Sequence, residues 1–186
     1  MAIPVILTVG STVFYPCQGP CLVGAAVERS VAGEPRNFYH LIVLDDSGGE
    51  LFVPVDKVQT IGIRPLVKRS DVLKLLGQLM KTSEIARDWK QRADDMLWLF
   101  TSGSAFNLAE IVGSLTEFSR TKMLSPRDSR TLARARKFLV CEISEVMGET
   151  KSAAEEQLDQ GLRARKIAVI SGKPDYQPLG EFSHNR

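Results

Sequence analysis

The pattern of apolar and polar positions changes once along the chain, near residues 64–69. Before that point, short apolar segments alternate with Gly, Pro and Asp, which predicts strands of a small antiparallel barrel. The expected strands cover residues 9–15, 21–27, 37–44, 51–55 and 58–63. After that point leucines recur at helical spacing and glycines are few, which predicts a helical second half.

Helix starts in the second half are marked by capping residues. Ser70 or Asp71 is expected to begin a helix that ends at residue 79, and Asp88 a helix that ends at residue 100. Ser104 is expected to begin a helix that ends at residue 118. Ser125 begins a long helix that ends at residue 147, and Thr150 begins the final helix. The sequence therefore predicts an α+β protein. Its expected parts are a barrel at 1–66, a compact all-α domain at 67–162 and a C-terminal tail at 163–186.

A tryptophan, Trp89, stands near the start of a predicted helix within a strongly charged hexapeptide. Helical spacing aligns it with the apolar residues at 93, 96, 97 and 100, which is typical of a packing residue. A bulky ring beside Lys90 and Arg92 also suits a wedge against nucleic acid bases. Periodicity alone favours the packing interpretation, and the context outside the helix has to decide. The second tryptophan of this helix, Trp98, is expected in the core.

A row of cations marks one face of the long predicted helix. Its members, at i, i+3, i+7 and i+10, are Arg127, Arg130, Arg134 and Lys137. Leucine, isoleucine and valine occupy the opposite side, so one side is expected to pack while the other presents positive charge. Such a row is either a solvated face or a partner for phosphates, and only Asp128 and Glu142 flank it.

Composition and charge narrow the classes of function. The 186 residues carry a net charge of +2, and residues 67–149 hold most of the basic excess, with 14 Lys and Arg against 11 Asp and Glu. Three cysteines (17, 21, 141) and two histidines form no zinc-ligand pattern, so we expect reduced structural thiols, no metal and no cofactor. The sequence has no nucleophile elbow and no phosphate-binding glycine loop, and we expect no enzymatic activity.

No apolar run of about 18 residues and no signal-peptide pattern occurs in the sequence. The prediction is a cytoplasmic protein without a membrane partner.

Several stretches together resemble the CarD and CdnL-like bacterial transcription regulators, which share their N-terminal module with transcription-repair coupling factor. They are Val9-Gly10-Ser-Thr-Val13-Phe-Tyr15-Pro16 with Gly19, Val27–Gly33, Val53–Val55, Gly62 with Arg64, Trp89, Leu124-Ser125, and Leu132–Leu139. The resemblance runs from about Thr8 to Leu162. Its opening strand and its helix signature are specific in combination, whereas either alone is common.

The resemblance implies a Tudor-like barrel that docks on the β subunit of RNA polymerase by its sheet edge. Arg29 and Val31 match positions that the family uses against polymerase, and Phe52 stands where some members have a basic contact residue. The helical domain would touch promoter DNA at the upstream edge of the transcription bubble. Trp89 matches the wedge tryptophan, and the other expected DNA contacts are Lys90, Arg92, Arg127, Arg130, Arg134 and Lys137.

The function implied is that of a non-enzymatic regulator, expected as a monomer, that stabilises the open promoter complex through minor-groove and phosphate contacts independent of sequence. Gln91 and Asp94 replace cations that often follow the wedge. An alternative is an adaptor whose barrel binds polymerase while the helices make only protein contacts. A third is a free-standing nucleic-acid binder, which the near-neutral charge disfavours.

Overall fold

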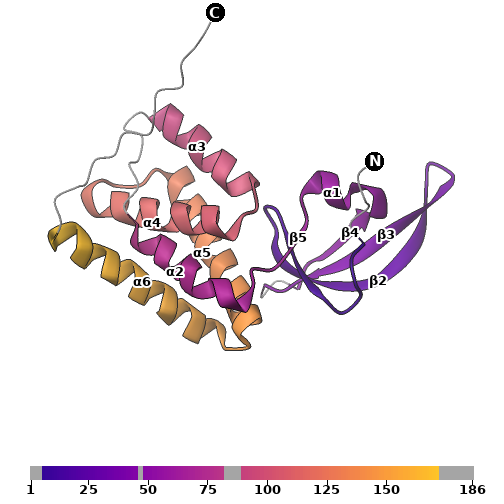
Figure 1. Ribbon diagram of the computed structural model, residues 1–186. Coiled ribbons are helices and arrows are strands. Elements are labelled where there is room, and N and C mark those ends of the chain that lie inside the picture. The colour runs from indigo at the N-terminus through magenta and orange to yellow at the C-terminus, as the bar shows by residue number, and fades with distance from the viewer. Residues whose placement is uncertain (1–5, 46–47, 82–88, 172–186) are drawn as a thin grey trace, which may run out of the picture.

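The computed structural model describes residues 6–45, 48–81 and 89–171, with the side chains of Trp89, Lys90, Arg92 and 165–171 outside the description. Figure 1 shows an antiparallel sheet beside a packed group of helices, with the short strand β5 leading from one to the other. The α+β class and the order of sheet before helices are confirmed.

The sheet has five antiparallel strands in the order β4-β3-β2-β1-β5. Their bounds are β1 Thr12–Tyr15, β2 Gly19–Val31, β3 Glu34–Val43, β4 Glu50–Pro54 and β5 Arg64–Pro65. Because β4 and β5 stand at opposite ends of this order, the described sheet is not closed, and the small barrel that we expected is only loosely supported.

The strand that we predicted at residues 58–63 does not form. Its absence also explains why the sheet stays open. Residues 55–57 form a 3-10 turn, η1 (Val55–Lys57), followed by the helical turn α1 (Val58–Ile61). The apolar residues Val58 and Ile61 stand three positions apart, which fits one face of a helix, whereas Ile61 and Ile63 fit the alternation of a strand. Gly62, at φ 82°, ends α1 in the left-handed region. Only the two residues of β5 are left to pair with β1.

The longest strands form the hairpin of β2 and β3, which extends away from the helices (Figure 1). Its turn residues, Ala32 and Gly33, both have positive φ, 54° and 86°. Two such residues suit a tight hairpin, because the turn then follows the twist of the strands. The distal half of the hairpin, residues 28–37, is exposed on both strands.

Five longer helices lie in the described part of the second half, where four or five were expected. They are α2 Val72–Met80, preceded by the 3-10 turn η2 (Arg69–Asp71), α3 Trp89–Thr101, α4 Ala105–Thr121, α5 Pro126–Met147 and α6 Lys151–Ser171. The Ser125 cap is confirmed, since its Oγ accepts from the backbone N of Asp128 at 3.1 Å. Thr150 caps α6 in the same way through the N–H of Ala153, and α6 continues to Ser171.

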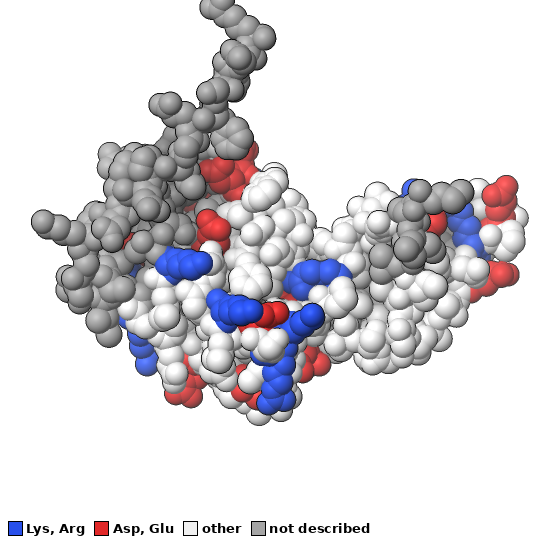
Figure 2. All heavy atoms as spheres, viewed as in Figure 1, with Lys and Arg blue, Asp and Glu red and all other residues white. Residues whose placement is uncertain are grey.

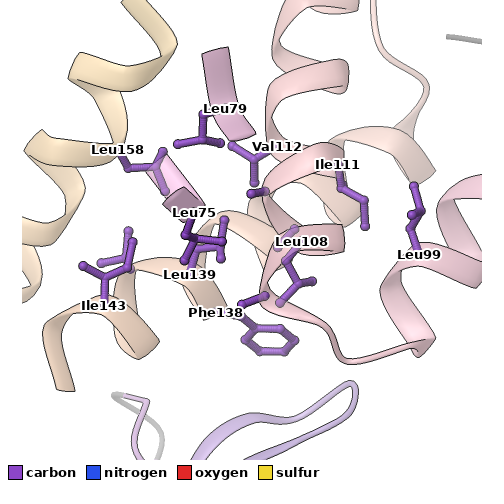
Figure 3. Close-up of a cluster of buried hydrophobic side chains, with 14 of the residues drawn as sticks. Leu75, Leu79, Leu99, Leu108, Ile111, Val112, Phe138, Leu139, Ile143 and Leu158 are labelled. Atoms are coloured by element: carbon purple, nitrogen blue, oxygen red, sulfur yellow. The ribbon is translucent and has the colours of Figure 1, made fainter. Parts of the chain in front are cut away.

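Two apolar cores fill the molecule. The sheet core includes Val23, Leu41 and Val53, and the helical core joins α2, α3, α4, α5 and α6 (Figure 3). Phe14 is the exception, because it lies on β1 yet is fully buried in the helical core. Its ring meets the ring of Phe138 of α5 edge-on, with centroids 5.9 Å apart. The two halves therefore share packed apolar surface.

Candidate functional site

The outer face of the sheet carries a stack of three side chains from three strands. The guanidinium of Arg29 on β2 lies 3.5 Å from the ring centroid of Phe52 on β4. On β3, the His40 ring lies parallel to Phe52, with centroids 4.9 Å apart and planes inclined by 13°. Two of the three predicted polymerase-contacting residues, Arg29 and Phe52, are thus brought together. The aromatic ring holds the cation at the surface of the sheet by a cation–π contact.

His40 is the member of this stack that the sequence did not suggest. It is the cross-strand partner of Phe52, and its Nε2 lies 3.1 Å from Glu50 Oε2. That approach does not meet hydrogen-bond geometry. Gly24 leaves room for the ring, because a Cβ there would lie 3.1 Å from His40 Nδ1. Alternation along β3 predicts that His40 and Leu41 point to opposite faces of the sheet. Only the register between β3 and β4 shows that His40 contacts Phe52.

The third predicted polymerase contact, Val31, lies at the end of β2 beside the hairpin turn. It is 43% exposed and pairs with Glu34 across the hairpin. It is not part of the Arg29–Phe52–His40 stack. Val31 therefore lies in the part of the β2–β3 hairpin that extends past β1 and β4.

The row of cations on α5 divides into two pairs. Arg127 and Arg130 are exposed near the start of the helix. Arg130 Nε donates to its own helix, to the carbonyl of Pro126, at 3.1 Å. Arg134 lies over the rings of Phe100 and Phe138, at 4.9 and 5.7 Å, and donates to the carbonyl of Cys17 in the sheet half.

Lys137, the last member of the row, also faces the sheet half. Its Nζ lies 2.9 Å from Asp45 Oδ2, in the connection between β3 and β4. The predicted face exists, but the sheet half engages its C-terminal members. All four cations are exposed, and Arg134 and Lys137 differ from Arg127 and Arg130 in that they reach the sheet half.

A buried carboxylate fixes the junction between the halves. Glu142 of α5 is fully buried and accepts from Arg64 Nη1 and Nη2 at 2.7 and 3.0 Å. It also accepts from the backbone N–H of Val67 at 2.8 Å. Arg64 Nε donates to the carbonyl of Gly103 at 2.7 Å, and the guanidinium lies 4.3 Å from the Phe14 ring centroid. Arg64 and Glu142 together thus link β1, the residues that follow β5, the α3–α4 loop and α5.

Close backbone approach at the junction depends on glycine. Gly19 has φ 95°, and a Cβ there would lie 2.7 Å from Phe138 Cδ1. Gly103 has φ 67°, and its Cβ would lie 3.0 Å from Pro16 Cγ. Any larger residue at either position would have to displace the sheet from α5 or from the α3–α4 loop.

The predicted wedge lies at the first position of α3, as expected, but its side chain and those of Lys90 and Arg92 are outside the described residues. Trp98 corrects our expectation of a core residue, because its side chain is 66% exposed. Helix α3 buries Ala93, Met96, Leu99 and Phe100, and Trp98 lies on the opposite side.

The cysteines are buried or half-buried free thiols. Burial, the nearby Cys141 and the charge of Asp45 raise the pKa of Cys21 to about 12. Cys21 Sγ donates to the carbonyl of Gly19 at 3.5 Å, and Cys141 Sγ to that of Leu44 at 3.3 Å. A thiol in this setting stays protonated and packs as a small apolar group.

The described residues also bear on metal ions and membranes. No group of three or more His, Cys, Asp or Glu residues there is placed to hold a metal ion. No helix in the described ranges combines the length and the apolar character needed to cross a bilayer.

Comparison with known proteins covers both halves of the chain. Residues 7–67 match the family described as CarD-like/TRCF RID domain, and residues 71–159 match the family described as CarD, C-terminal domain. A relative from Bacillus subtilis (strain 168), named "Putative transcription factor YdeB", is 26% identical over 147 residues. That alignment covers 77% of this chain and 94% of the relative. The order of the matched modules is the order of sheet and helices in the structure.

Proposed function

Because this chain belongs to the CarD family, as its two matched modules show, we propose that it regulates bacterial transcription by binding the β subunit of RNA polymerase and stabilising the open promoter complex. The observation that supports this most is that one chain carries both modules and joins them through a buried ion pair. A docking surface and a DNA-facing surface are then held in one arrangement. The protein would act in the cytoplasm as a monomer, without a cofactor.

Docking would use the β4 side of the sheet. β4 ends the strand order, so its outer backbone groups are available for strand addition. Phe52 lies on this strand and positions Arg29 beside it, which offers a fixed cation to a carboxylate on the polymerase. Val31 would add an apolar contact from the hairpin.

A binding measurement tests the docking surface. Arg29→Ala and Phe52→Ala should each weaken binding to the isolated β subunit about tenfold or more, as removal of a central interface residue does. Lys57→Ala, which removes an exposed cation elsewhere in the sheet half, is the control. Equal affinity for all three variants and the native protein would reject this surface.

The DNA contact would come from the start of α3 and from α5. We propose that Trp89 acts as a wedge at the upstream bubble edge, with Lys90, Arg92, Arg127 and Arg130 on nearby phosphates. Arg134 and Lys137 stay in the proposed set, at the side of the row that meets the sheet. Docking raises the local concentration of DNA, so a few phosphate contacts are sufficient.

The test of this contact is the half-life of a competitor-challenged open complex. Polymerase holoenzyme on a promoter prone to close is compared alone, with the native protein and with Trp89→Ala. The native protein should lengthen the half-life, and the variant should lose this effect while keeping its affinity for the β subunit. An effect that survives in the variant would reject the wedge.

An adaptor that does not touch DNA is the second candidate. It is favoured by the engagement of Arg134 and Lys137 with the sheet half. For the adaptor, Arg127→Gln and Arg130→Gln would leave the salt dependence of DNA binding by the docked complex unchanged. A phosphate contact at either residue would change that slope by about 0.9 at most.

A further inference from the structure

Helix α3 is apolar on more than one side. From Met96 to Phe100 it reads Met-Leu-Trp-Leu-Phe, five apolar residues in succession. Such a run covers the whole circumference of a helix, whereas a helix at the surface of a protein needs only one apolar stripe. Runs of this kind outside a core are typical of interaction sites.

The structure shows which members of the run the core uses. Met96, Leu99 and Phe100 are buried against α4 and α5, with no more than 8% of each exposed. Leu97 and Trp98 are on the other side, 51% and 66% exposed. They lie three and four residues after Asp94, which is exposed too. We define the outer face of α3 as Asp94, Leu97, Trp98 and Thr101.

The outer face differs from the single apolar residues exposed elsewhere. Leu73 is 80% exposed, but it stands beside the exposed Lys74, and the next residues on its side of α2 are the half-buried Leu76 and Gly77, which has no side chain. Isolated exposure of this kind is common in proteins. Trp98 and Leu97 are adjacent, and tryptophan is the residue type most enriched among those that dominate interface energies.

The charge of the outer face indicates the kind of partner. The described side chains of α3, at 91 and 93–101, include no Lys or Arg, and they do include Asp94 and Asp95. On the face shown in Figure 2, acidic side chains lie over α3 and the basic ones stand apart from it. A carboxylate beside a phosphate backbone is repelled, so DNA does not suit this surface.

We infer that the outer face of α3 binds a protein segment in which aliphatic side chains are flanked by lysine or arginine. The aliphatic side chains cover Trp98 and Leu97, and a cation pairs with Asp94. The segment is sought in RNA polymerase holoenzyme, so the inference rests on the proposed function and adds a second protein contact to it. The helical half then contacts protein through the outer face of α3, while the start of α3 and the cations Arg127 and Arg130 on α5 serve the DNA.

A site-specific cross-link tests the inference. The photoreactive residue p-benzoylphenylalanine replaces Trp98, and the full-length protein is irradiated with holoenzyme and promoter DNA. We expect an adduct with a protein subunit, at a peptide that carries Lys or Arg beside aliphatic residues. An adduct with DNA, or none at position 98 while the same probe at Phe52 reacts with the β subunit, overturns the inference and leaves the proposed function standing. No adduct from either position rejects both.

Affinity measurements provide a second readout. Trp98→Ser and Asp94→Lys should each weaken binding to the assembled promoter complex about fivefold or more, whereas Leu73→Ser, the matched exposed apolar residue, should not. Binding to the isolated β subunit should be the same for all three variants. Tighter binding of Asp94→Lys to the promoter complex would overturn the inference, because it would place DNA at this face.

Discussion

The two ends of the cation row on α5 have the same chemistry and different surroundings. Arg127 and Arg130 are exposed, and the hydrogen bond of Arg130 stays within the helix. Arg134 and Lys137, on the same face, reach Cys17 and Asp45 in the sheet half. The comparison teaches that helical spacing fixes which side chains share a face, while contacts between distant segments decide what covers it.

The difference also gives α5 two roles. Its C-terminal half binds the sheet through Phe138, Arg134, Lys137 and Glu142. Its N-terminal half carries Arg127 and Arg130, and the hydrogen bond of Arg130 stays within the helix. If the junction is weakened, Arg134 and Lys137 should lose their contacts with the sheet half and become as solvated as Arg127 and Arg130. The predictions below act on this junction, from the largest effect to the smallest.

The largest effect is expected from Arg64→Ala. The change leaves the Glu142 carboxylate buried without its bidentate partner, and breaking a buried pair in this way costs about 3 to 5 kcal/mol. Chemical denaturation should show this loss in the free energy of unfolding. The double variant Arg64→Ala with Glu142→Leu should recover part of it, because the uncompensated charge is then gone. A loss below about 1 kcal/mol for Arg64→Ala would contradict the role of this pair.

Gly19→Ala should act on the same junction through packing. Its Cβ would lie 2.7 Å from Cδ1 of Phe138, whose ring is buried, so the sheet and α5 must separate. We expect a loss of about 2 to 3 kcal/mol, as in overpacked cores, and a lower melting temperature. Gly33→Ala is the matched control, since Gly33 also has positive φ but no heavy atom within 4 Å of a Cβ. It should cost only the backbone strain, about 1 to 2 kcal/mol, and equal losses for the two variants would show that the contact with Phe138 is unimportant.

Arg134→Ala and Arg130→Ala sharpen the comparison directly. Removing Arg134 loses a cation–π contact and a hydrogen bond, so unfolding free energy should fall by about 1 kcal/mol. Removing Arg130 should change it by less than about 0.5 kcal/mol. The salt dependence of DNA binding should respond in the opposite order. Similar stability losses for the two variants would show that the row is not divided.

Much of the fold could be predicted from local signals. The helices of the second half follow leucine spacing, and Ser125 and Thr150 cap as expected. Asp71 and Ser104 stand at the N-cap positions of α2 and α4 without a side-chain cap hydrogen bond. The error at 58–63 arose because so short a segment carries both signals: the apolar residues at 61 and 63 fit a strand, and those at 58 and 61 fit a helical turn. Closure of the sheet could not be judged without knowing which strands pair.

The sites were less predictable because they depend on contacts between distant residues. Arg29 and Phe52 were singled out separately, but their contact requires β2, β3 and β4 to lie in register, and His40 has no distinguishing local signal. Trp98 was expected in the core because an aromatic residue in an apolar run usually is. Only one side of α3 packs against the core, and the spacing of apolar residues within the helix did not reveal which side that is.

The smallest effect is expected at Lys137 and Asp45. Their side chains are 50% and 20% exposed, so solvent screens the pair, and such ion pairs contribute about 0.2 to 1 kcal/mol. A double-mutant cycle with Lys137→Gln and Asp45→Asn should measure a coupling in this range that decreases with added salt. The same cycle built on Arg130 and Asp45 should show none. If the Lys137 coupling were also zero, the lysine would be free to turn toward DNA, and the division of the row would lie after Arg134.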